Sequence, residues 1–236
     1  TQDVAGPMRH AAQIGHGSQK LMEACVNAHS RGNFILTLGG DHSVALGTVA
    51  AAVTARPATK VLWVDAHADC NSPSTSPSGN AHGMPLAFLL KLVQSSELGA
   101  ASQAFAWLDD VRLAPQNLAF VGLRDVDAEE RKILLRLRER GAFVSTMHDV
   151  DRKGIGHVVD TARLWVGAPA HHAIDEILIR HVEEEEVLAR VAEIDPHQRT
   201  EQRVHGCLNL FISTLVHGPQ EPRVDRDGRG APAELA

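Results

Sequence analysis

The segment KVLWVDAHADCN (60–71) decides the fold, because a short apolar run passes directly into alternating acidic and imidazole side chains. A run such as VLWV, without polar positions, is typical of a strand buried in a parallel sheet. If the strand continues to residue 69, its two-residue repeat places Asp65, His67 and Asp69 on one face. The segment therefore predicts a central strand over 60–69 that delivers three ionisable groups to one place.

The rest of the chain alternates between strand and helix patterns. We expect further strands over 34–38, 117–125 and 142–147, and helices over 11–31, 43–55, 85–93, 129–141 and 151–166. Ser43 is the expected N-cap of the helix over 43–55. Strands that alternate with helices form βαβ units, which predicts an α/β fold with three α/β/α layers around a central, mainly parallel sheet.

Polar clusters follow the predicted strands directly: GGDHS (39–43), DAHAD (65–69) and RDVD (124–127). In a parallel sheet, ligands bind beyond the carboxyl ends of the strands, so these clusters should gather at one edge. Two adjacent carboxylates repel each other, and a divalent cation removes that conflict. Carboxylates with some imidazole suit Mn²⁺ better than Mg²⁺ or Zn²⁺. The alternative is a set of polar loops with hydrogen-bonded caps.

The loop SGNAHGMP (78–85) adds small polar donors and one histidine. Ser78 and Asn80 can bind a carboxylate through neutral hydrogen bonds. His82 can transfer protons near neutral pH, although a loop histidine is more often simply solvated.

Composition limits the class of protein. The 236 residues contain 44% hydrophobic and 22% charged residues and carry a formal net charge of −6, which argues against a general nucleic-acid binder. No apolar run approaches the ~20 residues that cross a bilayer, so we expect no membrane partner. Three widely spread cysteines indicate free thiols in a reducing cytoplasm. The first residue is Thr1, and we expect the sequence to begin inside a longer protein.

Taken in order, GGDHS, DAHADCN, SGNAHGMP and VGLRDVD resemble the motifs of arginase, within the manganese ureohydrolases. The resemblance covers residues from about 8 to 165 and includes HDVDRKGIGHVVD (148–160). It implies an arginase/deacetylase-like fold and hydrolysis of L-arginine to L-ornithine and urea at a pair of Mn²⁺ ions, as in arginine metabolism and the urea cycle. It also implies a homo-oligomer, a trimer or hexamer.

The resemblance also implies roles for individual residues. His42, Asp65 and Asp69 would bind one manganese ion, and Asp65 would bridge to a second ion bound by His67. The substrate's α-carboxylate would be held by Asn71, Ser78 and Asn80. Its α-amino group would be held by Asp127, with Asp125 and Glu130 nearby. His82 would relay protons. An agmatinase-like activity is an alternative, but Asn71 with SGN (78–80) favours a substrate that carries an α-carboxylate.

The family's later metal-binding segment, similar to SFDVDxxDP, is not recognisable here. Near matches are HDVD (148–151), with Asp149 and Asp151, and VDRDG (224–228), with Asp225 and Asp227; Glu193 in EIDP (193–196) superficially resembles the family's guanidinium-binding segment. We expect a partial arginase-like α/β domain over 1–166, a divergent, mostly helical segment over 167–218 with a helix over 174–194, and a disordered tail over 219–236. A catalytically inactive, truncated arginase-like protein that acts as a binding or interaction module is therefore the competing hypothesis to an active arginase-type hydrolase.

Overall fold

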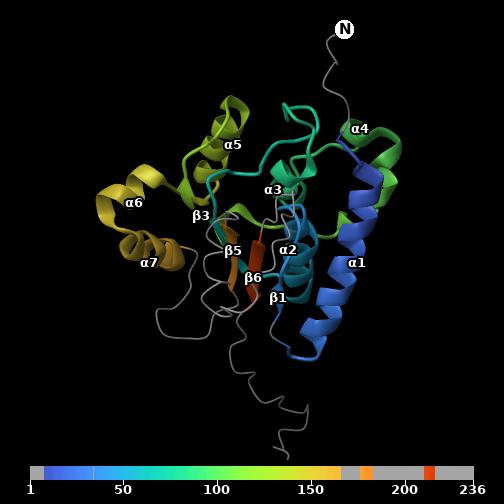
Figure 1. Ribbon diagram of the computed structural model, residues 1–236, viewed down its shortest axis with the longest axis horizontal. Helices are drawn as coiled ribbons and strands as arrows, with labels where there is room; N and C mark the ends of the chain where they lie inside the picture. Colours follow the sequence, from blue (N-terminus) through green and yellow to red (C-terminus); the bar gives the residue numbers. More distant parts are fainter. Residues whose placement is uncertain (1–7, 34, 166–175, 183–209, 216–236) are drawn as a thin grey trace, which may run out of the picture.

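The computed structural model describes residues 8–33, 35–165, 176–182 and 210–215, the last two ranges as backbone alone (Figure 1). The helices are α1 (Ala11–Ser30), α2 (Val44–Ala55), α3 (Pro85–Leu89), α4 (Ser95–Leu98), α5 (Ala128–Glu139), α6 (Met147–Lys153) and α7 (Ile155–Trp165). Short 3₁₀ helices are η1 (Ala81–Gly83), η2 (Gly99–Leu108) and η3 (Pro115–Asn117). The strands are β1 (Leu36–Thr37), β2 (Lys60–Val64), β3 (Leu118–Leu123), β4 (Phe143–Thr146), β5 (Glu176–Val182) and β6 (Leu210–Leu215).

These strands form one sheet in the order β1-β6-β5-β2-β3-β4. β5, β2, β3 and β4 pair in parallel, whereas β6 is antiparallel to both of its neighbours. The predicted mainly parallel sheet is thus confirmed. Because β2 lies between β3 and β5, its carboxyl end lies near the middle of the row of strand ends on that side of the sheet.

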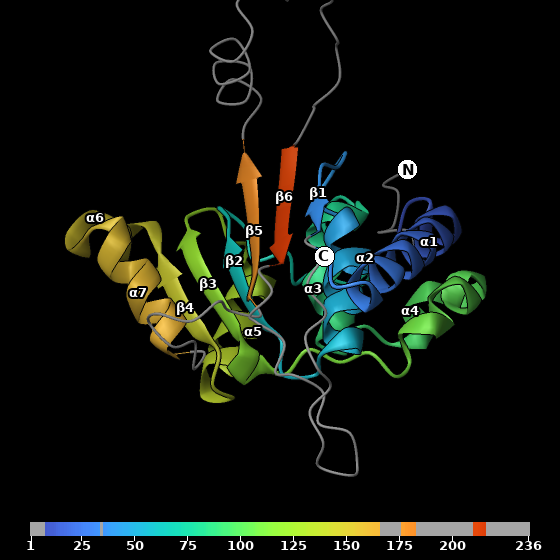
Figure 2. The same cartoon turned by 90° about the horizontal axis from the view of Figure 1, so that it is seen from below.

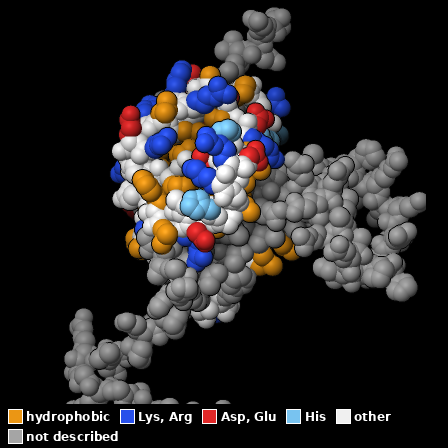
Figure 3. All heavy atoms as spheres, turned by 90° about the vertical axis from the view of Figure 1, so that its left-hand side faces the viewer, with side chains coloured by type: hydrophobic (Ala, Val, Ile, Leu, Met, Phe, Trp, Pro, Cys, Tyr) orange, Lys and Arg blue, Asp and Glu red, His pale blue; other side chains and the backbone are white. Residues whose placement is uncertain are grey.

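Helices cover both faces of the sheet, which confirms the predicted α/β/α layers (Figure 2). On one face, Trp63 and Phe120 pack into the larger core with residues of α2, α3 and α5. On the other face, Leu62 and Val121 pack against Val158 of α7 in a smaller core. Figure 3 shows basic and apolar side chains interspersed on the side of the molecule that carries α5, α6 and α7. Among the described residues, no helix is both long and apolar enough to span a membrane.

The central strand is shorter than predicted. β2 ends at Val64, and the Asp65 amide makes the next hydrogen bond, to the Val121 carbonyl (3.1 Å). The chain then turns: Oδ1 of Asp65 accepts the His67 amide hydrogen (2.9 Å), and Asp69 adopts a left-handed backbone with φ 48°. The prediction that Asp65, His67 and Asp69 share one strand face is therefore wrong, because a tight turn brings these side chains together.

Other details also differ from the sequence predictions. The strand predicted over 34–38 is reduced to β1 at the end of the sheet, and Leu36 and Leu38 are exposed rather than buried. The helix over 85–93 ends at Leu89, ahead of a left-handed Lys91 (φ 59°). Gly154 (φ 82°) divides the helix predicted over 151–166 into α6 and α7. Ser43 precedes α2, but its side chain makes no capping hydrogen bond to the helix.

The helix predicted over 174–194 is wrong where the structure describes the chain, because residues 176–182 form β5. This segment, EILIRHV, contains three β-branched residues, which favour strands, and it pairs in parallel with β2. β6 likewise lies within the segment predicted to be mostly helical. The remainder of 167–209 and the tail over 219–236 lie outside the described residues, so the division into domains stays a prediction.

Candidate metal centre

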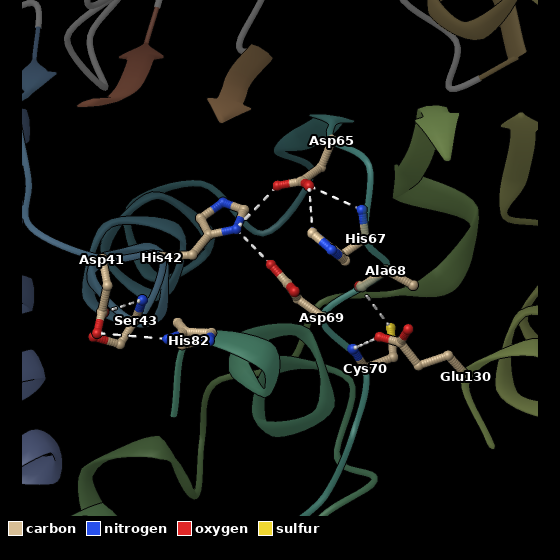
Figure 4. A network of polar contacts seen from close by, with 10 residues as sticks. All are labelled: Asp41, His42, Ser43, Asp65, His67, Ala68, Asp69, Cys70, His82 and Glu130. Atoms are coloured by element: carbon tan, nitrogen blue, oxygen red, sulfur yellow. Dashed lines mark hydrogen bonds and ion pairs between the residues drawn. The ribbon is translucent and has the colours of Figure 1, made fainter. Parts of the chain in front are cut away.

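His42, Asp65 and Asp69 meet at the carboxyl end of β2 (Figure 4). His42 lies in the turn before α2, and its Nδ1 is 3.2 Å from Oδ2 of Asp65. The same nitrogen forms an ion pair with Oδ2 of Asp69. One possible ligand atom from each residue lies within 4.8 Å of the others. The predicted convergence of two polar clusters at one edge is therefore realised.

Burial makes this cluster electrostatically demanding, since all three side chains are almost inaccessible to water. Burial lowers the pKa of His42, but hydrogen bonds to Asp65 and Asp69 outweigh this effect and raise it to about 9. For Asp65, burial opposes ionisation, yet His42 and His67 hold its pKa below the usual range. Burial raises the pKa of Asp69. A protonated His42 thus supplies the positive charge that two buried carboxylates require.

A divalent cation suits the same place. Two carboxylates and one imidazole are oxygen and nitrogen donors of the kind that Mn²⁺ and Zn²⁺ accept. A cation bound there would take over the charge role of the His42 proton, because an imidazole must be neutral to bind a metal. The residues present therefore fit a divalent metal ion.

The His42 ring also packs against Trp63, a residue that the sequence analysis did not single out. Trp63 of β2 is fully buried and stacks on the imidazole, with ring centroids 4.4 Å apart and planes 27° apart. Its indole N–H has no hydrogen-bond partner among the described residues. The sequence could have indicated this contact, because Trp63 precedes Asp65 by two residues and so lies on the same face of the strand.

The outer half of the cluster contains His67 and Asp125. Nδ1 of His67 is 3.3 Å from Oδ1 of Asp65, and its Nε2 is 3.4 Å from Oδ2 of Asp125. The side chains of His67 and Asp125 are 45% and 84% exposed. The hydrogen bond to Asp65 is the main cause that raises the pKa of His67 to about 9. Asp65 therefore lies between a buried half and an exposed half.

His82 faces a carboxylate that the sequence did not single out. Its Nδ1 lies 3.9 Å from Oδ2 of Asp41, and both side chains are about half exposed. The pKa of Asp41 is lowered to about 2, chiefly by His82, and the pKa of His82 is raised by the same partner. Asp41 also accepts a hydrogen bond from the Ser43 amide (2.9 Å). The sequence could have indicated Asp41, because it lies inside the GGDHS cluster.

Asn71 and Asp127, both predicted to bind substrate, contact each other. Nδ2 of Asn71 donates to Oδ2 of Asp127 (2.6 Å), while Oδ1 of Asp127 caps α5 by accepting from the amides of Glu129 (2.8 Å) and Glu130 (2.9 Å). Burial opposes ionisation of Asp127, but these hydrogen bonds outweigh it and lower its pKa. Ser78 is exposed and Asn80 is half-buried on the following loop, where Oγ of Ser78 accepts the Asn80 amide hydrogen (3.2 Å).

Comparison with known proteins agrees with this geometry. The Arginase family matches residues 1–176. The chain belongs to the arginase family.

Its relatives in this family include fungal and bacterial proteins. The arginase of Coccidioides posadasii (strain C735) is 41% identical over 176 residues, which are 71% of this chain and 52% of that protein. The arginase of Emericella nidulans is 46% identical over 165 residues, 66% of this chain and 49% of the relative. The chain thus spans about half the length of the curated relatives it matches.

Solved arginase structures share the fold. The Bacillus caldovelox arginase superposes with a TM-score of 0.61 at 32% identity, over 75% of this chain and 56% of that chain. A cold-adapted arginase from the yeast Glaciozyma antarctica gives 0.58 at 37% identity, over 70% and 56%.

In this member of the arginase family, Glu130 lies behind the site. Its Oε1 accepts the Cys70 amide hydrogen (3.2 Å) and its Oε2 accepts that of Asp127 (3.4 Å). Burial is the main cause that raises the pKa of Glu130 to about 7. Glu130 thus connects the loop that carries Asp69 and Asn71 to the start of α5.

Of the two D-x-D near matches, the structure describes HDVD (148–151), which lies in the first turns of α6. Asp149 accepts hydrogen bonds from the amide and hydroxyl of Thr146, both 3.0 Å, and one from Lys153 (3.2 Å), which is a capping arrangement for α6. Asp151 is exposed on the same helix. Glu193, Asp225 and Asp227 lie outside the described residues.

Proposed function

We propose that this chain is a manganese-dependent arginase-type amidinohydrolase that converts L-arginine to L-ornithine and urea. One observation carries the proposal: the buried His42–Asp65–Asp69 cluster and the Asn71–Asp127 pair share a single loop, in which residue 69 serves the first and residue 71 the second. The proposed cation site and the proposed amino-acid headgroup site would therefore lie next to each other, because Asp69 and Asn71 are only two positions apart in this loop.

His42, Asp65 and Asp69 would hold one manganese ion, and His67 with Asp65 would contribute to a second. A bound pair of such ions supplies an activated water and polarises the guanidinium group. The protein's own part would be to bring these four side chains together at the carboxyl end of β2. Trp63 and the main-chain turn at 65–67 keep two of them in place.

Substrate orientation would fall to the loop and to the start of α5. Because its pKa is lowered, Asp127 would offer an ionised carboxylate to an α-ammonium group, with Asp125 and Glu130 nearby. Asn71, Ser78 and Asn80 offer neutral donors to an α-carboxylate. An agmatine-type substrate would leave these three donors without a ligand.

His82 would move the proton that the departing amine requires. Asp41 raises the pKa of His82, so a larger fraction of the imidazole carries a proton near neutral pH. A protonated, half-exposed imidazole is suited to act as a general acid.

A second candidate is an inactive relative that binds metal without turnover. It is supported by the exposed outer half, where His67 contacts Asp65 on one side and the exposed Asp125 on the other. The family's later D-x-D segment is also not recognisable among the described residues. The two candidates differ in one measurement, namely catalysis in a protein that demonstrably holds manganese.

The test is urea release from L-arginine by purified protein with added Mn²⁺. The matched controls are the Asp69→Asn and His67→Ala variants, each assayed after metal binding has been measured. Turnover that exceeds both variants supports the hydrolase. Tight manganese binding without urea above these controls rejects it in favour of the inactive relative.

A further inference from the structure

The loop after the metal ligands is organised by one hydroxyl, that of Thr75. The backbone folds back on Ser72, whose carbonyl accepts from the amides of Thr75 (3.1 Å) and Ser76 (2.9 Å). The Ser72 amide donates to Oγ1 of Thr75 (2.8 Å). That hydroxyl has a single hydrogen, and the Oδ1 atom of Asn71 lies 2.8 Å away to accept it, closer than the Ser72 carbonyl at 3.4 Å.

This arrangement fixes which way the Asn71 amide faces. Its oxygen is held by Thr75, and its Nδ2 donates to Asp127 (2.6 Å). A carboxylate only accepts hydrogen bonds, so the opposite orientation would set the amide oxygen against the Asp127 oxygen. Nδ2 has two hydrogens, so it can serve Asp127 with one and a bound carboxylate with the other.

Glu97 attaches the same turn to a different element. Its Oε2 accepts from Oγ of Ser72 (2.6 Å) and from the Ser74 amide (3.0 Å). Its Oε1 accepts from the Gln94 amide (2.8 Å) at the start of α4. The turn that contains Thr75 is thus hydrogen-bonded to two helices. Glu97 connects it to α4, and the Asn71–Asp127 pair connects it to the start of α5.

We propose that Thr75 is a positioning residue that orients the Asn71 amide, and through it Asp127, for recognition of an amino-acid headgroup. The role in substrate binding rests on the proposed function, whereas the orientation of Asn71 does not. Without the hydroxyl, the Asn71 oxygen and the Ser72 amide both lose a partner, and the amide can rotate away from Asp127.

The first experiment measures Asn71 directly in metal-free, ¹⁵N-labelled protein. Thr75→Val removes the hydroxyl at nearly constant volume, Thr75→Ser restores it, and Ser74→Ala is the matched control in the same turn. We expect Thr75→Val to move the Asn71 side-chain amide resonances and to speed their hydrogen exchange on the order of tenfold. Thr75→Ser and Ser74→Ala should resemble the wild type. An unchanged Asn71 amide in a folded Thr75→Val protein would overturn the proposal.

The second experiment measures KM and kcat for L-arginine with Mn²⁺. A headgroup defect should raise KM on the order of tenfold in Thr75→Val, with a smaller change in kcat and recovery in Thr75→Ser. A fall in kcat at unchanged KM would remove the substrate role from Thr75. A wild-type protein that releases no urea would refute the proposed function, and the amide measurement would still decide the orientation of Asn71.

Discussion

The two halves of the candidate metal centre share Asp65 but are built in opposite ways. On the inner side, His42 and Asp69 are buried, and Trp63 supports the imidazole from behind. On the outer side, His67 is 45% exposed and its partner Asp125 is 84% exposed. Water can solvate the outer side chains, whereas the two inner carboxyl groups must be neutralised by a positive charge or by protonation, because they are buried.

This difference indicates what each half can do before metal arrives. The inner half is a preformed site, in which the His42 proton holds the place of a cation until one binds. In the outer half, His67 contacts the buried Asp65 and the exposed Asp125. We therefore expect the inner half to dominate both stability and metal affinity.

The largest effect should come from His42→Ala. Removing the imidazole leaves Asp65 and Asp69 facing each other in a buried place, which should cost roughly 3–5 kcal/mol of the free energy of unfolding without metal. Chemical denaturation with and without Mn²⁺ measures this cost, and the variant should also lose stabilisation by Mn²⁺. A metal response that survives in His42→Ala would break the comparison, because the inner half would then not be the binding site.

A second large effect concerns the buried carboxyl of Glu130, behind the inner half. Its pKa of about 7 exceeds the ordinary value of 4.5, so the folded state binds more protons than the unfolded state between these values. Its contribution to stability is therefore complete below about pH 4.5 and is lost as pH rises through 7. Glu130→Gln imitates the protonated form. Relative to this variant, the wild type should lose on the order of 2–3 kcal/mol between pH 4.5 and 8 in denaturation experiments. Parallel pH profiles for the two proteins would contradict the assignment.

A moderate effect is expected at Trp63, which distinguishes the inner histidine from the outer one. An aromatic stack contributes about 0.5–1.5 kcal/mol, which corresponds to at most about tenfold in affinity. Trp63→Leu should weaken Mn²⁺ binding by up to that factor, whereas Trp63→Phe retains a ring and should remain within about threefold of the wild type. Titration followed by electron paramagnetic resonance measures both. Equal affinities in the two variants would mean that the stack does not orient His42.

The smallest effect should come from His67→Ala. The His67 side chain is 45% exposed, so water weakens its ion pairs. We expect them to contribute about 0–1 kcal/mol, and the free energy of unfolding should change by less than that amount. The inner site should still bind Mn²⁺, with any loss confined to a second, weaker ion. Calorimetric titration of the variant beside His42→Ala measures this contrast directly. A loss as large as that in His42→Ala would mean that the halves are not separable.

The same contrast shows how far sequence reasoning reaches. The apolar run VLWV and the clusters after each strand were sufficient to predict the sheet and the meeting of His42 with Asp65 and Asp69. They could not show where β2 ends, because the turn depends on Asp65 accepting its neighbour's amide and on a left-handed Asp69. The strand β5 was missed for a different reason. The acidic run from Glu183 to Glu186 follows it directly, and such a run is typical of an exposed helix, so the whole segment was predicted to be helical.

Contacts that form only in the folded loops explain the remaining misses. Glu97 and Thr75 belong to segments with no chemical motif of their own, and their role follows from hydrogen bonds that only the folded loop creates. Asp41 was visible in the sequence but lacked a partner until the fold placed His82 beside it.

The central claim is that the buried half binds a divalent cation, and manganese stoichiometry tests it most directly. Calorimetric titration of metal-free wild-type protein with Mn²⁺, beside His42→Ala and His67→Ala, should show at least one ion per chain in the wild type. That ion should persist in His67→Ala and vanish in His42→Ala. Absence of binding by the wild type, or equal binding by all three proteins, would contradict the account.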